Sequence, residues 1–584
     1  MTHLRRFLHH YPLWPALIIL AVFFGYPVLE LLSVSLTNLK GTFTFENYEK
    51  VLASAVYMKA LKTTLVISGL VSVFSVVLAY PIAYLMATTS VSSRQILMLL
   101  VLLPFWSGFL VKTFAALIIF GFQGPVNQLL VSLGLVERPV EMINNMTAVV
   151  VSMTHSLMPL AVLTMFAVME NIDRRLVQAG ATLGGSAAQT FWRIYFPLSL
   201  NGVLAAAVLV FISSLGFFIT PAILGSPNET MIAQVIMRLV LEMSNWSVGG
   251  ALAVILFLSA LAIFLVFQLV FGSVAMGGEG TRGDKAGDGL LSRAGRSLLA
   301  GAANLTDAVA KLIPRGFPGS RMTLRFIGLA GIVFLAAPAL IVIPVSFNDS
   351  QFLQFPPTSF STRWYAEFFG SEIWMTATVR SLLVALATAI IAVVVGTAAA
   401  FVLVREQVPG KGLLIGFIMA PLILPRMAVA VALFFFLARL GLASTPFALV
   451  IGHSILAIPY VVVAVSAVLK RYDRRLDQAA SSLGASPARV YRHITLPLIR
   501  PGLFAAGLFA FITSFDDLNI ALFVSGGLQN TLPNQMWSSM YLAASPILGA
   551  ASTVILVTLS AVLITAELLR RASERKLNLS GPES

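Results

Sequence analysis

Long apolar stretches alternate with short polar segments along the whole chain. Some of these stretches, such as 327–345 and 548–566, contain no charged residue. A helix that crosses a bilayer needs about 20 mostly apolar residues, so each such stretch predicts a membrane span. The pattern predicts twelve spans in two sets of six, at 13–36, 61–88, 96–120, 147–169, 202–225, 247–273, 324–346, 379–404, 412–438, 447–469, 502–526 and 548–569. We therefore expect an all-α polytopic membrane protein.

The composition agrees with this interpretation and excludes a soluble protein. Apolar residues make up 58% of the 584 positions, and charged residues only 11%, whereas soluble domains carry roughly 25% charged residues. The mean hydropathy is +0.91. The chain has no cysteine, which excludes disulfides, thiol chemistry and cysteine metal sites.

The net charge of +14 is explained by the placement of the basic residues. With the N-terminus in the cytoplasm, 27 of the 38 Lys and Arg fall on cytoplasmic segments, 8 on outer segments and 3 within spans or at uncertain ends. Such a bias orients membrane proteins, so we predict a multi-pass protein of a bacterial cytoplasmic (inner) membrane with both termini cytoplasmic. We expect the lipid bilayer to be a partner of this chain, and we expect no nucleic-acid partner. No signal-peptide cleavage site follows the first apolar run, which we interpret as an uncleaved span.

The segment 274–323 separates the two sets of spans. It opens with glycine-rich, charged sequence at 277–289, which is typical of a linker. We therefore predict a first half at 1–273, a cytoplasmic linker at 274–323 and a second half at 324–584. Residues 290–312 could form an interfacial amphipathic helix, but the composition favours a flexible tether.

The two halves share an internal repeat at an offset of 300 residues. The segment 173–198 contains Asp-Arg-Arg-Leu, Gln-Ala, Leu-Gly, Ile and Pro-Leu at the same spacing as the segment 473–498. Each half crosses the membrane six times, so the repeat is parallel, with its axis along the membrane normal. A substrate pathway between the halves is the natural expectation.

The repeat is centred on two predicted cytoplasmic loops, 170–200 and 470–500, which we call the first and second repeated loops. In each, a short helix at 179–192 or 479–492 is expected to break near a glycine and stop before a proline. Such a helix could dock on a two-fold partner or simply lie on lipid. The repeat alone favours neither possibility.

At these residues the chain resembles the permease subunits of ABC importers. Their cytoplasmic motif is Glu-Ala-Ala, three residues, Gly, nine residues, Ile-x-Leu-Pro, and both repeated loops keep its spacing. Gln replaces Glu in both copies, which removes a charge that could pair with a partner Arg. The matching positions are Gln178, Ala179, Gly180, Gly184 and Pro197 in the first loop, and Gln478, Ala479, Ala480, Gly484 and Pro497 in the second.

The resemblance implies that the repeated loops contain coupling helices that dock into ATPase subunits. The chain has no Gly-x-x-x-x-Gly-Lys-Ser/Thr phosphate loop. We therefore expect two separate ABC ATPase subunits on the cytoplasmic face, as a homodimer, with ATP and Mg²⁺ bound there and no cofactor on this chain. The resemblance also implies a periplasmic or extracellular solute-binding protein, and it makes this chain a permease rather than an enzyme.

A closer similarity covers nearly the whole chain. Leu-Pro-Phe-Trp at 103–106 and Gly-Pro-Val-Asn at 124–127 resemble the first permease of spermidine/putrescine importers. Ala-Pro-Leu-Ile-Leu-Pro at 420–425, Gly-His-Ser at 452–454 and Ser-Phe-Asp-Asp at 514–517 resemble the second. The chain thus looks like a natural fusion of two type I importer permeases. Polyamine is the implied substrate; fused permeases for ferric iron, thiamine, aminophosphonates or opines are alternatives.

Two acidic residues are the main candidates for substrate recognition. Asp516 and Asp517 fall within the predicted eleventh span, where ionisable residues are costly and mark functional sites. Their counterparts at the offset of 300 are Gly216 and Phe217, so the architecture does not require the acids. A cationic substrate would supply their counter-charge. A buried pair with Arg426 or Arg439, or a helix-end site near the outer surface, is the structural alternative.

Aromatic residues in the spans could add cation–π contacts to such a path, although aromatic residues are also common packing and interface residues. Lys112 and Arg426 are expected to extend outward or to pair with the acids. His155 and His453 have no metal-ligand spacing and are interpreted as helix-packing hydrogen bonders. The aromatic candidates are Phe105, Trp106, Tyr460, Phe515, Trp537 and Tyr541.

These features predict a permease that works by alternating access. A twelve-span secondary transporter has the same 6+6 arrangement, but its usual charged loop between spans two and three corresponds here to 88–94, which is short and nearly uncharged. An intramembrane enzyme is a third possible class, but the sequence contains no nucleophile or metal constellation that would support it.

Overall fold

The computed structural model describes residues 11–37, 42–275, 301, 304, 320–527, 529–542 and 544–579. Apart from its first and last few residues and positions 301 and 304, the predicted linker lies outside them. Within the described residues the secondary structure is helical, and strand-like pairing is limited to two isolated bridges, Thr37 with Phe43 and Asn348 with Phe360. The prediction of an all-α membrane protein is confirmed.

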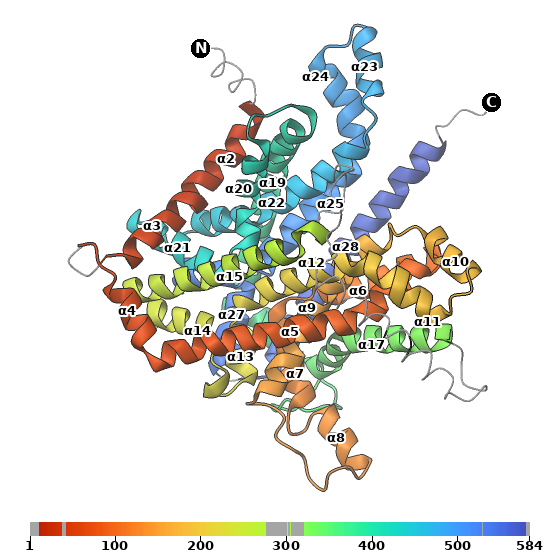
Figure 1. The fold of residues 1–584 in the computed structure, drawn as a ribbon. Helices are drawn as coiled ribbons and strands as arrows, with labels where there is room; N and C mark the ends of the chain where they lie inside the picture. Colours follow the sequence, from red (N-terminus) through yellow and green to blue (C-terminus); the bar gives the residue numbers. More distant parts are fainter. Residues whose placement is uncertain are drawn as a thin grey trace.

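The first half is built around the 34-residue helix α5, which packs against α9 and α12 (Figure 1). Its helices are α2 (Trp14–Leu20), α3 (Tyr26–Ser35), α4 (Glu46–Ala53), α5 (Ala55–Thr88), α6 (Val91–Trp106), α7 (Phe109–Phe120), α8 (Pro125–Ser132), α9 (Met146–Met169), α10 (Arg174–Thr182), α11 (Ala187–Thr190), α12 (Phe196–Leu215), α13 (Ile219–Leu224), α14 (Ile232–Met237) and α15 (Trp246–Ala275).

The second half repeats this order. Its helices are α17 (Ser320–Ser346), α18 (Arg363–Gly370), α19 (Glu372–Arg405), α20 (Lys411–Ile423), α21 (Arg426–Arg439), α22 (Pro446–Arg471), α23 (Arg475–Ser482), α24 (Pro487–Val490), α25 (Leu496–Phe515), α26 (Asn519–Val524), α27 (Leu532–Leu542) and α28 (Ile547–Leu579).

Ten helical segments of the described chain are long and apolar enough to cross a membrane, and a bent pair of helices would add an eleventh. That pair is α20 and α21, which meet at an angle of 98°. The twelfth predicted span, 548–569, falls on α28, a helix of 33 residues whose stretch Ile547–Val562 is apolar.

Four of the predicted spans are interrupted, which corrects their expected continuity. The span predicted at 96–120 breaks between α6 and α7, and the span at 412–438 breaks between α20 and α21. The spans at 202–225 and 502–526 end at Leu215 and Phe515 and resume as the short helices α13 and α26. Hydropathy does not reveal these breaks because the interrupted segments are apolar on both sides. Pro425 contributes to one break, since proline disfavours the helical conformation of the residue before it.

The two halves exchange their first spans. Helix α3 packs against α21 of the second half, and α17 packs against α5, α6 and α7 of the first half. The described residues form two apolar clusters, and the larger one runs through both halves and includes Leu20 from α2 as well as Leu433 and Ile455. Burial of apolar surface thus joins the halves at their centre.

The repeated loops lie at the ends of α5 and α19 that are opposite to α4 and α18. Arg174 donates a hydrogen bond to the carbonyl of Ala87 near the end of α5, and Arg405 at the end of α19 pairs with Asp477. In Figure 1, α23 and α24 are at the upper right and α10 and α11 at the right, whereas α4 and α8 are at the left and bottom.

The helices of the repeated loops do not stop before the prolines, contrary to expectation. Each loop continues through a π-helical turn, Phe191–Tyr195 or Tyr491–Thr495, directly into α12 or α25. Proline has no N–H to donate to the helix, and it sits at the start of the α-helix that follows the π turn. A π turn already changes the hydrogen-bond register, which lets the helix pass through Pro197 and Pro497.

Candidate functional site

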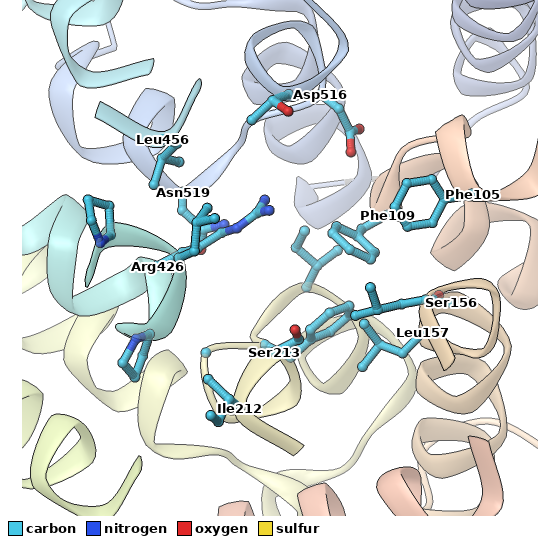
Figure 2. Close-up of a pocket in the computed structure, with 18 of the residues that line it drawn as sticks. Phe105, Phe109, Ser156, Leu157, Ile212, Ser213, Arg426, Leu456, Asp516 and Asn519 are labelled. Carbon is cyan, nitrogen blue, oxygen red and sulfur yellow. The ribbon is translucent and has the colours of Figure 1, made fainter. Parts of the chain in front are cut away.

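The interrupted spans of the two halves meet around a central cavity of about 200 Å³. The α6–α7 and α20–α21 breaks contribute to its wall, together with the α12–α13 and α25–α26 breaks. Figure 2 shows Phe105 and Phe109 at the right, Arg426 and Asn519 at the left, Asp516 at the top, and Ile212 and Ser213 at the bottom. The cavity therefore lies between the halves, where the parallel repeat predicts a pathway.

The cavity preserves the pseudo-two-fold relation in its backbone but not in its charges. Gly216, in the α12–α13 break, lies beside Pro425 and Arg426 of the other half. The equivalent residue, Asp516, lies beside Gly108, where an added Cβ would come 1.9 Å from Oδ1 of Asp516. A side chain at position 108 would collide with the carboxylate, so this close approach requires glycine.

Asp516 reaches from the second half to the start of a helix in the first half. Its carboxylate faces the backbone N–H of Phe109, the first residue of α7. The N-terminus of a helix carries partial positive charge and stabilises an anion. Asp516 also lines the cavity and is partly accessible there, so its carboxylate can meet a solute.

Asp517 has a different position, although it is the next residue. It is 2% exposed and does not line the cavity. Both of its carboxylate oxygens accept a hydrogen bond from the backbone N–H of Ile520, at 3.3 Å, so it caps α26. Neither acid lies inside a continuous helix, because α25 ends at Phe515 and α26 begins at Asn519.

Two cations that the sequence places in spans face this site. Lys112 is 2% exposed, donates to the carbonyl of Ser156 at 3.4 Å and lies 5.2 Å from the ring centroid of Phe109. Arg426 extends into the cavity beside the hydroxyl of Tyr460. Both attract Asp516 electrostatically. Lys112 and Arg426 therefore line the same cavity as Asp516 and do not extend outward, and among the residues that the structure describes no ion pair joins either of them to Asp516 or Asp517. Arg439 pairs instead with Glu30.

The aromatic candidates divide into three groups. Phe105 and Tyr460 line the cavity. Phe515 is buried and stacks on Phe511, and Trp537 is buried between Phe218 and Tyr541, so both lie behind the wall. Tyr541 is 54% exposed outside the cavity. The side chain of Trp106 lies outside the described residues.

Sequence analysis did not identify the neutral polar lining. Ser156, Ser213, Thr513 and Asn519 are polar residues of the wall. These residue types are common in spans, and only the breaks in the helices show which of them converge. The two histidines have packing roles: His155 bonds the carbonyl of Leu335 at 3.1 Å, and His453 bonds Ser514 at 2.7 Å.

The repeated loops form a second candidate site. They contribute no residue to the lining of the cavity. Gly184 and Gly484 adopt φ values of +83° and +84°, a left-handed conformation that glycine adopts without strain. Each ends the preceding helix and leaves the leucine before it projecting from the surface. Leu183 is 88% exposed and Leu483 is 89% exposed.

Part of the motif lies on this surface in both loops. Gly180 packs against Ile194, and Ala480 in the same position is buried, so these two face the loop interior. Pro197 and Pro497 start α12 and α25. The exposed motif residues are Gln178, Ala179, Gly184, Gln478, Ala479 and Gly484.

The chain is similar to proteins from two permease groups. The spermidine/putrescine transport system permease protein PotB of Haemophilus influenzae is 29% identical over 249 residues, which cover 41% of this chain and 87% of that protein. The putrescine transport system permease protein PotI of Escherichia coli K12 is 35% identical over 257 residues, which cover 43% of this chain and 91% of that protein.

Among solved structures, a bacterial alginate ABC transporter, crystallised with an alginate pentasaccharide-bound periplasmic protein, matches with a TM-score of 0.42 and 20% identity. The match covers 47% of this chain and 97% of that one.

A family model matches the chain twice. The family is described as binding-protein-dependent transport system inner membrane component, and the matches cover residues 66–273 and 392–578. Each match falls in one six-span half, which confirms the prediction of a fused permease. The chain therefore belongs to the family of binding-protein-dependent transport system inner membrane components and carries two copies of its domain.

Proposed function

We propose that this chain is the membrane permease of an ATP-driven importer that passes polyamines, such as spermidine or putrescine, from a solute-binding protein to the cytoplasm. The observation that carries the proposal is a carboxylate, Asp516, in the cavity between two permease halves. Relatives of the chain are named as spermidine/putrescine and putrescine permeases. The fused halves are 1–273 and 324–584, joined by a cytoplasmic linker at 274–323.

The chemistry of the cavity suits a flexible organic cation. A protonated amine can donate to the carboxylate of Asp516 and to neutral hydroxyl oxygens such as those of Ser213 and Thr513. The faces of Phe105 and Tyr460 can add cation–π attraction. A wall made mostly of apolar residues accommodates the methylene segments of a polyamine.

The repeated loops are proposed to dock on two ATPase subunits, which bind ATP and Mg²⁺ and form a homodimer. Leu183 and Leu483 support this, because a fully exposed leucine at the same position of two repeats suits burial in a partner groove. The excess of basic residues supports a cytoplasmic position for these loops and both termini. The solute-binding protein then delivers substrate at the opposite face.

The position of the breaks supports the proposal of alternating access. The cavity wall is made by short helical segments from both halves, so a change in the relation of the halves changes which side reaches the cavity. ATP binding to the ATPases can drive this change only if the loops contact the ATPases differently in the two states. The importer needs a binding protein, as the family description states, and a secondary transporter does not.

Reconstitution tests the proposal. Proteoliposomes that contain this chain, its ATPase and its binding protein are expected to accumulate radiolabelled putrescine only with internal ATP. Deletion of 479–492 is expected to abolish both copurification of the ATPase and uptake. Uptake that survives this deletion would refute the ATP-coupled mechanism.

The substrate class is tested separately with the same vesicles. Ferric iron, thiamine, an aminophosphonate and an opine are offered in place of putrescine. ATP-dependent uptake of one of these without uptake of either polyamine would overturn the polyamine assignment and leave the importer assignment standing.

A further inference from the structure

Trp537 and Tyr541 do not line the cavity, yet they connect its wall to the protein surface. Phe218, the residue before α13, is buried in the cavity wall. Its ring meets that of Trp537 edge to face, with the centroids 5.1 Å apart, and Trp537 stacks on the exposed Tyr541 at 5.4 Å. The three rings therefore form a continuous row from the cavity to the surface, which we call the aromatic row.

The aromatic row lies on the side of the cavity that is opposite to the repeated loops. The N–H of Leu532, at the start of α27, donates to Ser381 at 2.7 Å, and Ser381 lies near the α18 end of α19. The N–H of Asn144, just before α9, donates to the carbonyl of Leu224 at the end of α13, at 2.8 Å. The first repeated loop follows the far end of α9. Both α13 and α27 therefore lie between the cavity and the outer side.

The contact at the centre of the row joins the two halves. Phe218 belongs to the first half and Trp537 to the second, and α27 contacts α7 and α13 of the first half. Both rings are buried in the larger apolar cluster, so water is excluded between them. A packed aromatic pair is stabilised by its buried area and by its ring geometry. A relative movement of the halves must separate this pair before a solute can pass here.

The row occurs on only one of the two pseudo-equivalent sides. At the offset of 300 residues, the counterpart of Phe218 is Leu518, and that of Trp537 is Met237. Leu518 is also buried. Aliphatic side chains therefore suffice for packing at these positions, and the helical framework does not require the aromatic rings.

We propose that Phe218 and Trp537 seal the cavity from the outer side, and that the substrate enters between α13 and α27 when the two rings part. The inference rests on the proposed alternating-access function. It makes the rings part of the substrate's route, because an aromatic face that becomes exposed attracts a passing ammonium group. The pseudo-equivalent side, with Leu518 and Met237, is not the route of entry.

The absence of cysteine from the chain allows a direct test of the seal. Ser213→Cys places one thiol on the exposed part of the cavity wall. Its labelling from outside by the charged, membrane-impermeant reagent MTSET is followed in spheroplasts that express the full-length chain with its ATPase. Trp537→Ala should speed this labelling about tenfold, because it removes an aromatic pair and its buried area. Met237→Ala, at the equivalent position, is the matched control and should leave the rate unchanged.

The outcomes separate the seal from the identity of the solute. Equal labelling rates with and without Trp537→Ala would overturn the seal, and an equal acceleration by Met237→Ala would overturn one-sided entry. Labelling needs no solute, so a chain that shows the expected rates without putrescine uptake would lose the polyamine assignment and keep the seal.

A second variant covers the case in which Trp537→Ala folds poorly. Phe218→Leu installs the residue type that the repeat has at position 518 and keeps most of the apolar volume. It should speed the labelling of Ser213→Cys about threefold, as expected for the loss of ring geometry alone. An unchanged rate in this variant would contradict the proposal.

Discussion

The two halves share one fold, but they fix their repeated loops to the bundle by different chemistry. In the second half, Asp477 accepts hydrogen bonds from Tyr472 at 2.5 Å and Thr495 at 2.9 Å and pairs with Arg405 at 2.9 Å. In the first half, position 177 is valine, and no such polar centre forms among the described residues.

Aromatic packing replaces the ion pair in the first half. Phe191 contacts Tyr80, Tyr84 and Tyr195, with ring centroids 5.6 to 6.1 Å apart. Tyr195 occupies the position of Thr495. The comparison shows that the helical framework determines the position of each repeated loop. Either an ion pair or aromatic packing can then fix the loop at that position.

The same division occurs at the cavity. The second half supplies both acids, and their equivalent positions in the first half are the uncharged Gly216 and Phe217. Departures from the repeat therefore mark specialised chemistry, and agreement between the halves marks shared machinery. The predictions below test this rule.

The largest effect is expected where the halves agree. Leu183→Asp and Leu483→Asp should each weaken ATPase binding by about 30-fold, because a buried anchor at an interface contributes ~2 kcal/mol or more. Pull-down of the ATPase by the purified chain measures this. Leu542→Asp, at another highly exposed leucine (83% exposed), is the matched control. Loss with only one loop variant would show that the loops are not equivalent.

A smaller effect is expected from the ionic anchor of the second loop. Asp477→Asn removes the partner of Arg405, whose side chain is only 24% exposed, and should lower the free energy of unfolding by about 2 kcal/mol. SDS-induced unfolding of the purified chain measures it. The control is Asp349→Asn, which breaks the more exposed pair with Arg363 and should cost less than ~1 kcal/mol. Equal losses would remove the distinction between the two pairs.

The aromatic anchor of the first loop should respond more weakly. Phe191→Leu keeps apolar volume but loses the ring geometry, at an expected cost of about 1 kcal/mol. The loss should not depend on salt, since no ion pair is involved, whereas the loss for Asp477→Asn should shrink between 0.05 and 0.5 M NaCl. Unfolding of both variants at the two salt concentrations tests the comparison, and the same salt response in both would break it.

Sequence patterns predicted the spans, the repeat and the repeated loops because each depends on local residue type. Apolar runs reveal spans through their composition, and the motif at 178–197 recurs at a fixed offset. The exchange of α3 and α17 between halves was not predictable, since it depends on contacts between residues far apart in the chain.

The candidate site was predicted only in part. The departure of Asp516 and Asp517 from the repeat drew attention to both, but their separate roles depend on a break in the helix that hydropathy does not show. Lys112 was expected to extend outward or to pair with the acids, and it lies buried in the cavity wall, where it donates to the carbonyl of Ser156. Asn519 and Ser213 became candidates only once the breaks brought them together.

The most direct test of the central claim compares the two adjacent acids in ATP-dependent putrescine uptake by proteoliposomes. Asp516 lines the cavity, so Asp516→Asn should reduce uptake at least about tenfold, as expected for loss of a charged hydrogen-bond partner, while ATPase binding is retained. Asp517→Asn should act mainly by weakening the cap of α26, and uptake per folded molecule should stay nearer that of the wild type. Wild-type uptake by Asp516→Asn would contradict the account.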